Sequence, residues 1–274
     1  MLGKPVANQL KADGFNVRIL SRSPEKATVL FGNGFEVFKG DIEDPVSLRQ
    51  ALEECSGVHI NIKGGPKSED YDRLEHRGTR TIVRAAQSVG IKQITYLSAY
   101  TIQEKNSRSP ESRAKFKAEE AIRTSGIPYT IFRASWFMES LPLFVQGKQA
   151  LVIGKQPNPL HWVAAADYAR MVSRSYQIST ALGKAFYIYG PQSFTMKQAL
   201  QIYRQNVVPH VQIATMPIWL MTLLGAITFN VEWQSLAQLM AYYDQIGEEG
   251  QPDEANRLLG APQTTLQQWC EAQH

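Results

Sequence analysis

Polar and small side chains suited to a phosphate-containing ligand follow several short apolar runs of this sequence. They stand in five loops that also carry apolar and aromatic residues, namely Arg22; Asp41 with Ile42; Ile62 with Lys63, Gly64 and Gly65; Ser98 to Tyr100; and Ala134 to Phe137, which includes Trp136. In an open parallel sheet, ligands bind outside the carboxyl ends of the strands, so loops at these ends converge on one cleft. A guanidinium, a carboxylate and a glycine loop in one cleft suit a dinucleotide. We therefore expect these residues to bind such a cofactor.

Arg22 and Asp41 bear on which dinucleotide is bound. A guanidinium after the second strand of such a fold can hold a 2′-phosphate in a two-pronged contact, where a carboxylate would hold a ribose hydroxyl. Arg22 therefore favours NADP(H) over NAD, although the SRSPEK segment also fits a solvated basic turn. Asp41 can accept a hydrogen bond from an adenine amino group, or it can cap the turn that leads to Pro45.

Lys117 is a candidate catalytic residue on a predicted helix that faces the strand at Ile94. An ammonium there can donate to the nicotinamide ribose and stabilise negative charge on a substrate oxygen. Half of a surface ion pair is the alternative role for such a lysine. Trp136 and Phe137, with Trp162, can form an apolar lid over the nicotinamide. The alternative is that these three aromatic side chains belong to the hydrophobic core.

The segment from Ser112 to Glu139 predicts how these loops are positioned. Ala118 and Ile122 recur at helical spacing, and Gly126 then ends the helix. Tyr129 to Phe132 reads as a buried strand, and Ile94 to Leu97 is its expected parallel partner.

The same alternation of helix and strand runs through the first half of the chain. Further strands are predicted at 15–20, 35–38 and 58–62, with helices opened by Ser23–Pro24 and by Asp44–Pro45. This pattern predicts an α/β protein with a doubly wound parallel sheet. We expect a nucleotide-binding domain over residues 1–145 and a smaller, mainly helical region over 146–274 that forms a wall of the substrate site. Leu151 to Ile153 and Ala185 to Tyr189 can extend or flank the same sheet.

Composition excludes several other classes of protein. The chain has 274 residues, 43% of them apolar, and 29 Lys and Arg against 25 Asp and Glu without a dense basic block, so a nucleic-acid partner is not expected. Cys55 and Cys270 form no CxxC motif and no histidine pair has metal-ligand spacing, so we predict no metal and a reducing, cytoplasmic location. The apolar run from Met216 to Phe229 is too short to span a bilayer, and we predict a buried helix there in preference to membrane contact.

Four sequence motifs resemble the NmrA-like branch of the atypical short-chain dehydrogenases. They are LGKPVANQLKADGFNVRILSRSPEKA, KGDIEDPVSLRQAL, TIVRAAQSVGIKQITYLSAY and KAEEAIRTSGIPYTIFRASWFMES, and they span about residues 1–175 in the family's order. The resemblance implies a Rossmann domain that binds NAD(P). It further implies that Gly3 is the last glycine of the dinucleotide-binding turn, that Arg22 recognises the NADP phosphate and that Lys117 lies near the nicotinamide ribose.

The sequence departs from the family pattern in two places. The first strand and the earlier glycines would precede Met1, so we expect Met1 to be an internal methionine of a longer natural chain. Arg113 stands four residues before Lys117, where short-chain dehydrogenases usually carry a tyrosine acid, and a guanidinium cannot supply a proton. Tyr100 is the expected substitute.

Two functions follow from this resemblance. One is an NADPH-preferring oxidoreductase that passes hydride to a small quinone or carbonyl acceptor. The other is a non-catalytic NADP(H) sensor or assembly factor that acts through a protein partner.

Overall fold

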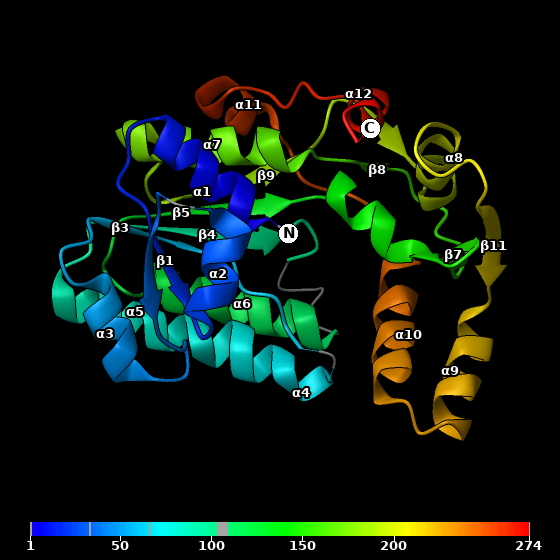
Figure 1. Cartoon of the computed structure of the whole chain (residues 1–274), viewed down its shortest axis with the longest axis horizontal. Coiled ribbons are helices and arrows are strands. Elements are labelled where there is room, and N and C mark those ends of the chain that lie inside the picture. The colour runs from blue at the N-terminus through cyan, green and yellow to red at the C-terminus, as the bar shows by residue number, and fades with distance from the viewer. Residues whose placement is uncertain (1, 33, 66, 103–108, 274) are drawn as a thin grey trace.

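The computed structural model describes residues 2–32, 34–65, 67–102 and 109–273, and it confirms the predicted α/β fold (Figure 1). The central sheet has the order β3 (Gly57–Ile60), β4 (Gln93–Ala99), β5 (Tyr129–Ala134) and β9 (Lys184–Ile188), and all its strands are parallel. Ile94 pairs with Tyr129 and Leu97 pairs with Phe132, so the predicted partner strands are confirmed. Parallel strands place their carboxyl ends, and the loops that follow, at one edge of the sheet.

A separate parallel pair of strands precedes the central sheet. β1 (Arg18–Ser21) pairs with β2 (Glu36–Lys39), and α1 (Gly3–Ala12), α2 (Pro24–Phe31) and α3 (Pro45–Leu52) alternate with them. In the described residues no strand joins β1 to β3, so the expected first strand of the fold is not among them.

Local capping explains where several helices begin. The Asp44 carboxylate accepts the amide of Val46 at 3.0 Å at the start of α3, and Pro45 supplies a helical φ at the next position. α6 (Pro110–Arg123) begins in the same way, because the Ser109 hydroxyl accepts the amide of Ser112 at 3.0 Å. A long helical segment precedes β4 and consists of α4 (Ser68–Asp70), the π-helical η1 (Tyr71–Gly78) and α5 (Thr79–Val89).

The central sheet is covered on both faces, as its alternating apolar residues require. Phe132 packs toward α1 and α7 (Ala165–Gln177), and its neighbour Ile131 packs toward α3, α5 and α6 (Figure 1). Both side chains are fully buried, and each such burial stabilises the fold by roughly 1.5–3 kcal/mol. This two-sided cover fixes the sheet and therefore the loops at its carboxyl edge.

Residues after 146 contribute both to the central sheet and to a second layer. β9 extends the central sheet, as predicted for residues 185–189, whereas β7 (Gln149–Ile153) lies in a separate sheet between β11 (Gln212–Met216) and β6 (Val145–Gln146). The remaining elements pack around them and are η3 (Met138–Phe144), β8 (Leu160–His161), η4 (Ser179–Ala181), β10 (Ser193–Phe194), α8 (Met196–Asn206), α11 (Asp253–Leu259) and α12 (Leu266–Glu271).

The prediction of a buried helix over residues 216–229 is wrong. α9 (Ile218–Ile227) forms a hairpin with α10 (Val231–Tyr243) at one end of the molecule, and only Met221 and Gly225 of α9 are buried (Figure 1). Trp219 is 67% exposed and Phe229 is 87% exposed. An apolar run packs as core only if other elements cover it, and a single partner helix covers one side. Across the described ranges, no helix is both long enough and apolar enough to cross a bilayer.

Candidate active site

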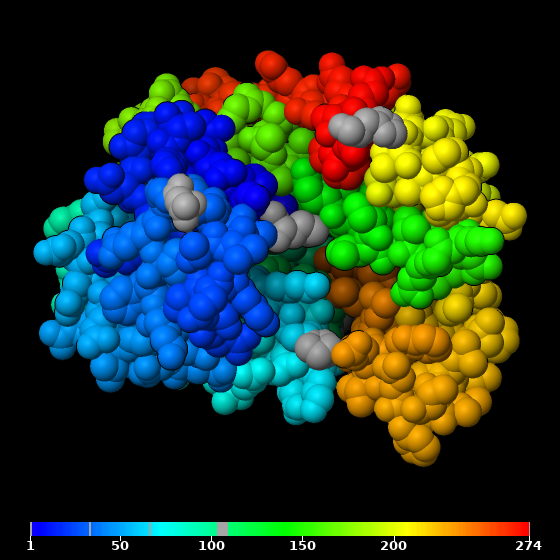
Figure 2. All heavy atoms as spheres, in the orientation of Figure 1, coloured from blue at the N-terminus to red at the C-terminus, as the bar shows by residue number. Residues whose placement is uncertain are grey.

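A cleft of about 370 Å³ lies at the carboxyl edge of the central sheet. It is lined from α1, from the loop after β3, from the ends of β4 and β5, and from η1, η3, α6 and α10, by Leu2, Gly3, Asn61, Ile62, Lys63, Glu75, Leu97, Ser98, Ala99, Tyr100, Glu111, Lys115, Ala134, Ser135, Trp136, Phe137, Ser140 and Tyr243. Figure 2 shows a hollow on this face between the blue and cyan N-terminal elements and the orange helix α10. Of the five loops expected to converge, those after β3, β4 and β5 therefore line this cleft, and those that carry Arg22 and Asp41 do not.

The cleft brings together several of the residues predicted from sequence. They are Gly3, Ile62, Lys63, Ser98, Tyr100, Ala134 and Trp136. Gly3 opens α1, where no side chain of the described residues caps the first turn. Free backbone amides and the helix dipole make such an end attractive to an anion, which fits a pyrophosphate.

Other predicted residues lie outside the lining of this cleft. Arg22 follows β1 directly and its side chain is exposed. The Asp41 carboxylate accepts a hydrogen bond from the amide of Glu43 at 3.0 Å. This contact caps the turn that leads to Pro45, which is the alternative to a contact with adenine. Ile42 packs against the core and lies so close to Gly78 that a Cβ atom on Gly78 would come within 2.9 Å of the Ile42 side chain. Gly64 lies close to the ring of Tyr71.

The structure moves the candidate lysine from Lys117 to Lys115. Lys117 lies on the exposed side of α6, whereas Lys115 is 7% exposed and lines the cleft. The buried stripe of α6 includes Ser112, Ala118 and Ile122, and Lys115 belongs to it at helical spacing. Lys115 is not among the residues predicted from sequence, although its spacing from Ser112 and Ala118 places it on the buried stripe.

Lys115 is held by groups from two other elements. Its Nζ lies 3.3 Å from Oε2 of Glu75 in η1, and it stands 5.8 Å from the ring centroid of Tyr96 in β4. The other oxygen of Glu75 accepts the amide of Gly64 at 2.9 Å. A buried charge persists only when it is paired, so Glu75 fixes this ammonium at the cleft wall. Sequence reasoning did not identify Glu75.

Glu111 stands four residues before Lys115 and lines the same cleft. With Lys115 as the lysine at the cleft, Glu111 and not Arg113 stands where short-chain dehydrogenases usually carry the tyrosine. The hydroxyl of Tyr243 in α10 donates to Oε2 of Glu111 at 3.3 Å. Removal from water and the nearby Glu75 carboxylate raise the pKa of Glu111 to about 7.

Ser98 and Glu119 link β4 to α6 beneath the cleft. The Ser98 hydroxyl donates to Oε1 of Glu119 at 2.7 Å, and Arg133 donates to both oxygens of the same carboxylate at 3.0 and 2.7 Å. Arg123 adds a further contact at 3.3 Å. This network holds α6 in one rotation against the sheet, and that rotation aims Lys115 and Glu111 into the cleft.

Aromatic side chains form the apolar part of the cleft. Trp136 packs edge-on against Tyr243, with ring centroids 5.2 Å apart. Trp162 is fully buried and donates to the carbonyl of Phe194 at 3.1 Å, so it belongs to the core and not to a lid. Burial raises the pKa of Tyr100, because a phenolate would be poorly solvated there. A phenol of that kind is a weak acid, which disfavours Tyr100 as the proton donor.

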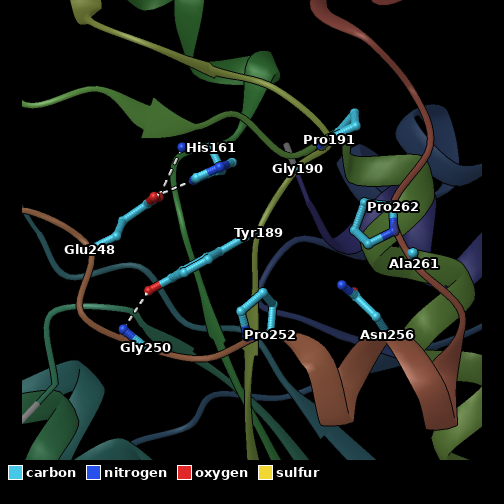
Figure 3. Close-up of a pocket in the computed structure, with 10 residues that line it drawn as sticks. All are labelled: His161, Tyr189, Gly190, Pro191, Glu248, Gly250, Pro252, Asn256, Ala261 and Pro262. Carbon is cyan, nitrogen blue, oxygen red and sulfur yellow. Dashed lines mark hydrogen bonds and ion pairs between the residues drawn. The ribbon is translucent and has the colours of Figure 1, made fainter.

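A second pocket, of about 460 Å³, lies beside the first and is shown in Figure 3. His161 contacts Glu248 there at 2.5 Å, and its ring stacks on Tyr189 with a centroid distance of 5.5 Å. Glu248 also accepts a hydrogen bond from Ser135, which lines the first cleft. The contacts from Ser135 to Glu248 to His161 therefore connect the two pockets.

A parallel sheet with helices on both faces and a ligand cleft at its carboxyl edge defines a dinucleotide-binding class of protein. The chain belongs to the NAD(P)H-binding family, whose model matches residues 1–174. The family resemblance found in the sequence is thereby confirmed at this level.

Known proteins similar to this chain include both assembly factors and reductases. The photosystem II assembly factor Ycf39 of Trieres chinensis is 24% identical over 262 residues, which cover 90% of this chain and 79% of that protein. Quinone oxidoreductase 2 of Escherichia coli is 26% identical over 193 residues, which cover 68% and 63% of the two chains. Among solved structures, an NADPH-dependent quinone oxidoreductase from Escherichia coli in complex with NADPH has a TM-score of 0.76 and 20% identity, covering 100% of this chain and 96% of that one.

Proposed function

We propose that this protein is an NADPH-preferring oxidoreductase that reduces a small quinone or carbonyl compound. The observation that carries the proposal is the cleft itself. It combines the uncapped start of α1, the buried Lys115 and the aromatic wall at Trp136 at the edge where this fold binds ligands. The relative named as a quinone oxidoreductase supports the same reaction class.

Different residues of the described chain would bind the dinucleotide, hold the acceptor and stabilise the charge that develops on it. The first turn of α1 would attract the pyrophosphate, and Arg22 would hold the added 2′-phosphate. The bound dinucleotide supplies hydride. Trp136 and Phe137 would hold the flat acceptor and keep water away from it, while Lys115 would stabilise negative charge that develops on the acceptor oxygen.

NADPH oxidation by the purified protein, measured across a panel of quinones and aldehydes, tests this proposal. We expect turnover with at least one acceptor, and slower turnover in the Lys115→Met variant. Lys117→Met is the matched control on the exposed side of the same helix. Tight NADPH binding without turnover of any acceptor would count against an enzyme.

The second candidate is a non-catalytic NADP(H) sensor or assembly factor that acts through a protein partner. It is favoured by the relative described as an assembly factor and by the exposed apolar surface of the α9–α10 hairpin. This candidate predicts a protein partner whose binding differs between the NADP and NADPH complexes. The Phe229→Ser variant should lose that partner and keep its dinucleotide affinity, whereas equal binding in both redox states would contradict the sensor.

A further inference from the structure

We propose that Glu111 is the catalytic acid of this cleft and delivers the proton to the acceptor oxygen. The inference rests on the proposed oxidoreductase function and names the group that such a reaction needs. Its first support is position, because Glu111 lines the cleft from the same face of α6 as Lys115. Residues four apart on a helix lie one above the other, so both can reach one substrate atom.

The ionic contacts around Glu111 favour its protonated form. Lys115 is paired with Glu75 at 3.3 Å, and no ion pair joins Glu111 to a cation within the described parts of the chain. The buried ammonium of Lys115 is therefore paired with Glu75, and a second negative charge on Glu111 is costly beside it because it has no ion-pair partner of its own among the described residues. The charged and titratable groups around Glu111 are Glu75 and Tyr71 of η1, Tyr96 of β4, Lys115 of α6, Tyr242 and Tyr243 of α10, and Lys63 after β3.

The balance of these groups leaves a proton on Glu111 near neutral pH. Its pKa is raised to about 7, mainly by removal from water and then by Glu75, and Lys115 and Lys63 oppose the rise. A catalytic acid works best when its pKa lies near the working pH. The phenol of Tyr100 does not meet this condition, because its ordinary pKa of 10.0 is already above neutral pH and burial raises it further.

In the proposed step a carbonyl acceptor is reduced by hydride from the bound dinucleotide and a proton from Glu111. The acceptor carbon takes hydride, and the π electrons of its C=O bond move to the oxygen. That oxygen forms an O–H bond with the proton of Glu111, which is left as a carboxylate next to Lys115 and regains a proton from water. For a carbonyl acceptor the products are an alcohol and the oxidised dinucleotide. In a quinone, hydride adds to one carbonyl oxygen, the ring π electrons shift to the other oxygen, and that oxygen takes the proton of Glu111, which gives a hydroquinone.

The isosteric variant Glu111→Gln tests the step, with Glu120→Gln on the exposed side of α6 as the matched control. We expect kcat for aldehydes to fall roughly 10²- to 10⁴-fold in Glu111→Gln, the usual contribution of a positioned acid. The loss should be smaller for quinones, because a hydroquinone anion is a far weaker base than an alkoxide and can take its proton later. NADPH affinity, measured by fluorescence titration, should stay within about twofold of wild type. Glu120→Gln should match wild type in every measurement.

Two pH measurements separate a chemical role from a structural one. The kcat of the wild type should fall as pH rises through about 7, and this limb should be absent in Glu111→Gln. Carboxyl-carbon NMR of the cofactor-free protein should show a glutamate that titrates near neutral pH and disappears in the variant. If Glu111→Gln leaves kcat and its fall with pH unchanged, or if Glu111 titrates near 4, Glu111 is not the catalytic acid, and the proposed oxidoreductase function is unaffected. Absence of turnover in the wild type would overturn the proposed function as well.

Discussion

Single side chains beneath the cleft illustrate how much the site depends on buried charge. Glu119 and Arg133 have side chains that are 3% and 18% exposed, and their contact shares an oxygen with Ser98 at the end of β4. A buried pair is expensive to break, because the remaining charge stays in a poorly solvated place. Residues that never touch a substrate therefore control the position of those that do.

We predict that Glu119→Gln lowers the free energy of unfolding by roughly 3–5 kcal/mol, because Arg133 keeps its charge and loses its carboxylate. Urea denaturation should show a lower midpoint with an unchanged slope. The neighbouring Glu120→Gln, on the exposed side of the helix, should change the midpoint very little. Equal stability of the two variants would mean that the Glu119 pair contributes little.

Arg22 provides a residue-scale test of cofactor choice. We predict that Arg22→Gln weakens NADPH binding roughly 10- to 100-fold, as expected for the loss of a charged two-pronged hydrogen bond, and leaves NADH binding unchanged. Isothermal titration calorimetry with both dinucleotides measures this difference. Lys26→Gln, an exposed cation in the following helix, is the control. An equal loss for NADH would contradict recognition of a 2′-phosphate by Arg22.

At the scale of elements, α9 packs mainly against α10 and is otherwise largely exposed. Gly225 of α9 sits where the two helices approach most closely, and a Cβ atom there would lie 3.0 Å from Cγ and 3.1 Å from the backbone nitrogen of Gln234. The Asn230 side chain accepts the amide of Trp233 at 3.1 Å and starts α10. A hairpin of this kind can open without unfolding the sheet.

We predict that Gly225→Val forces the two helices apart, because the added atoms meet the backbone of α10 and not a flexible side-chain end. Amide hydrogen exchange should become faster in α9 and α10 and stay slow in β4. Ala226→Val places the same side chain at the exposed neighbouring position and should leave exchange in α10 unchanged. Uniformly faster exchange would show that the hairpin and the sheet unfold together.

At the scale of the whole molecule, pH links buried groups to stability. His59 is half-buried against β4, where its Nδ1 contacts Thr95 Oγ1 at 2.8 Å, and removal of its ring from water lowers its pKa from 6.5 to about 4. The unfolded chain therefore binds a proton on this residue below about pH 6.5 while the folded chain does not. The contribution of His59 to stability is complete above pH 6.5 and is lost as the pH falls toward 4.

We predict that wild type loses roughly 3 kcal/mol more than His59→Phe between pH 7 and pH 4, which corresponds to the difference between these two pKa values. Urea denaturation across that range measures the loss. Glu111 acts in the opposite direction, since its raised pKa reduces stability as pH rises through 4.5 to 7, but it is present in both proteins and cancels in the comparison. His210 is exposed, so His210→Gln should lose the same stability as wild type over this pH range. If all three proteins show the same dependence of unfolding free energy on pH, His59 does not cause the loss.

The sequence by itself determined the alternation of helix and strand, the helix starts at Ser23–Pro24 and Asp44–Pro45, and the pairing of β4 with β5. The strand pairing follows from the helix that connects the two strands. The helix starts depend on residues within a few positions of each other, such as the Asp44 carboxylate and the amide of Val46. Local patterns of this kind are readable because the interacting groups share one element. The family and its cofactor class followed from the same patterns.

Only the tertiary structure decided which charged residues of α6 face the cleft. Lys115 and Lys117 are two positions apart, and the choice between them depends on the rotation of the helix against β4, which Glu119 fixes through Ser98 and Arg133. The partners of Lys115 and Glu111 come from η1 and from α10, far away in the chain. Exposure of α9 was decided in the same way, since hydrophobicity drives an element toward burial only where another element is present to cover it.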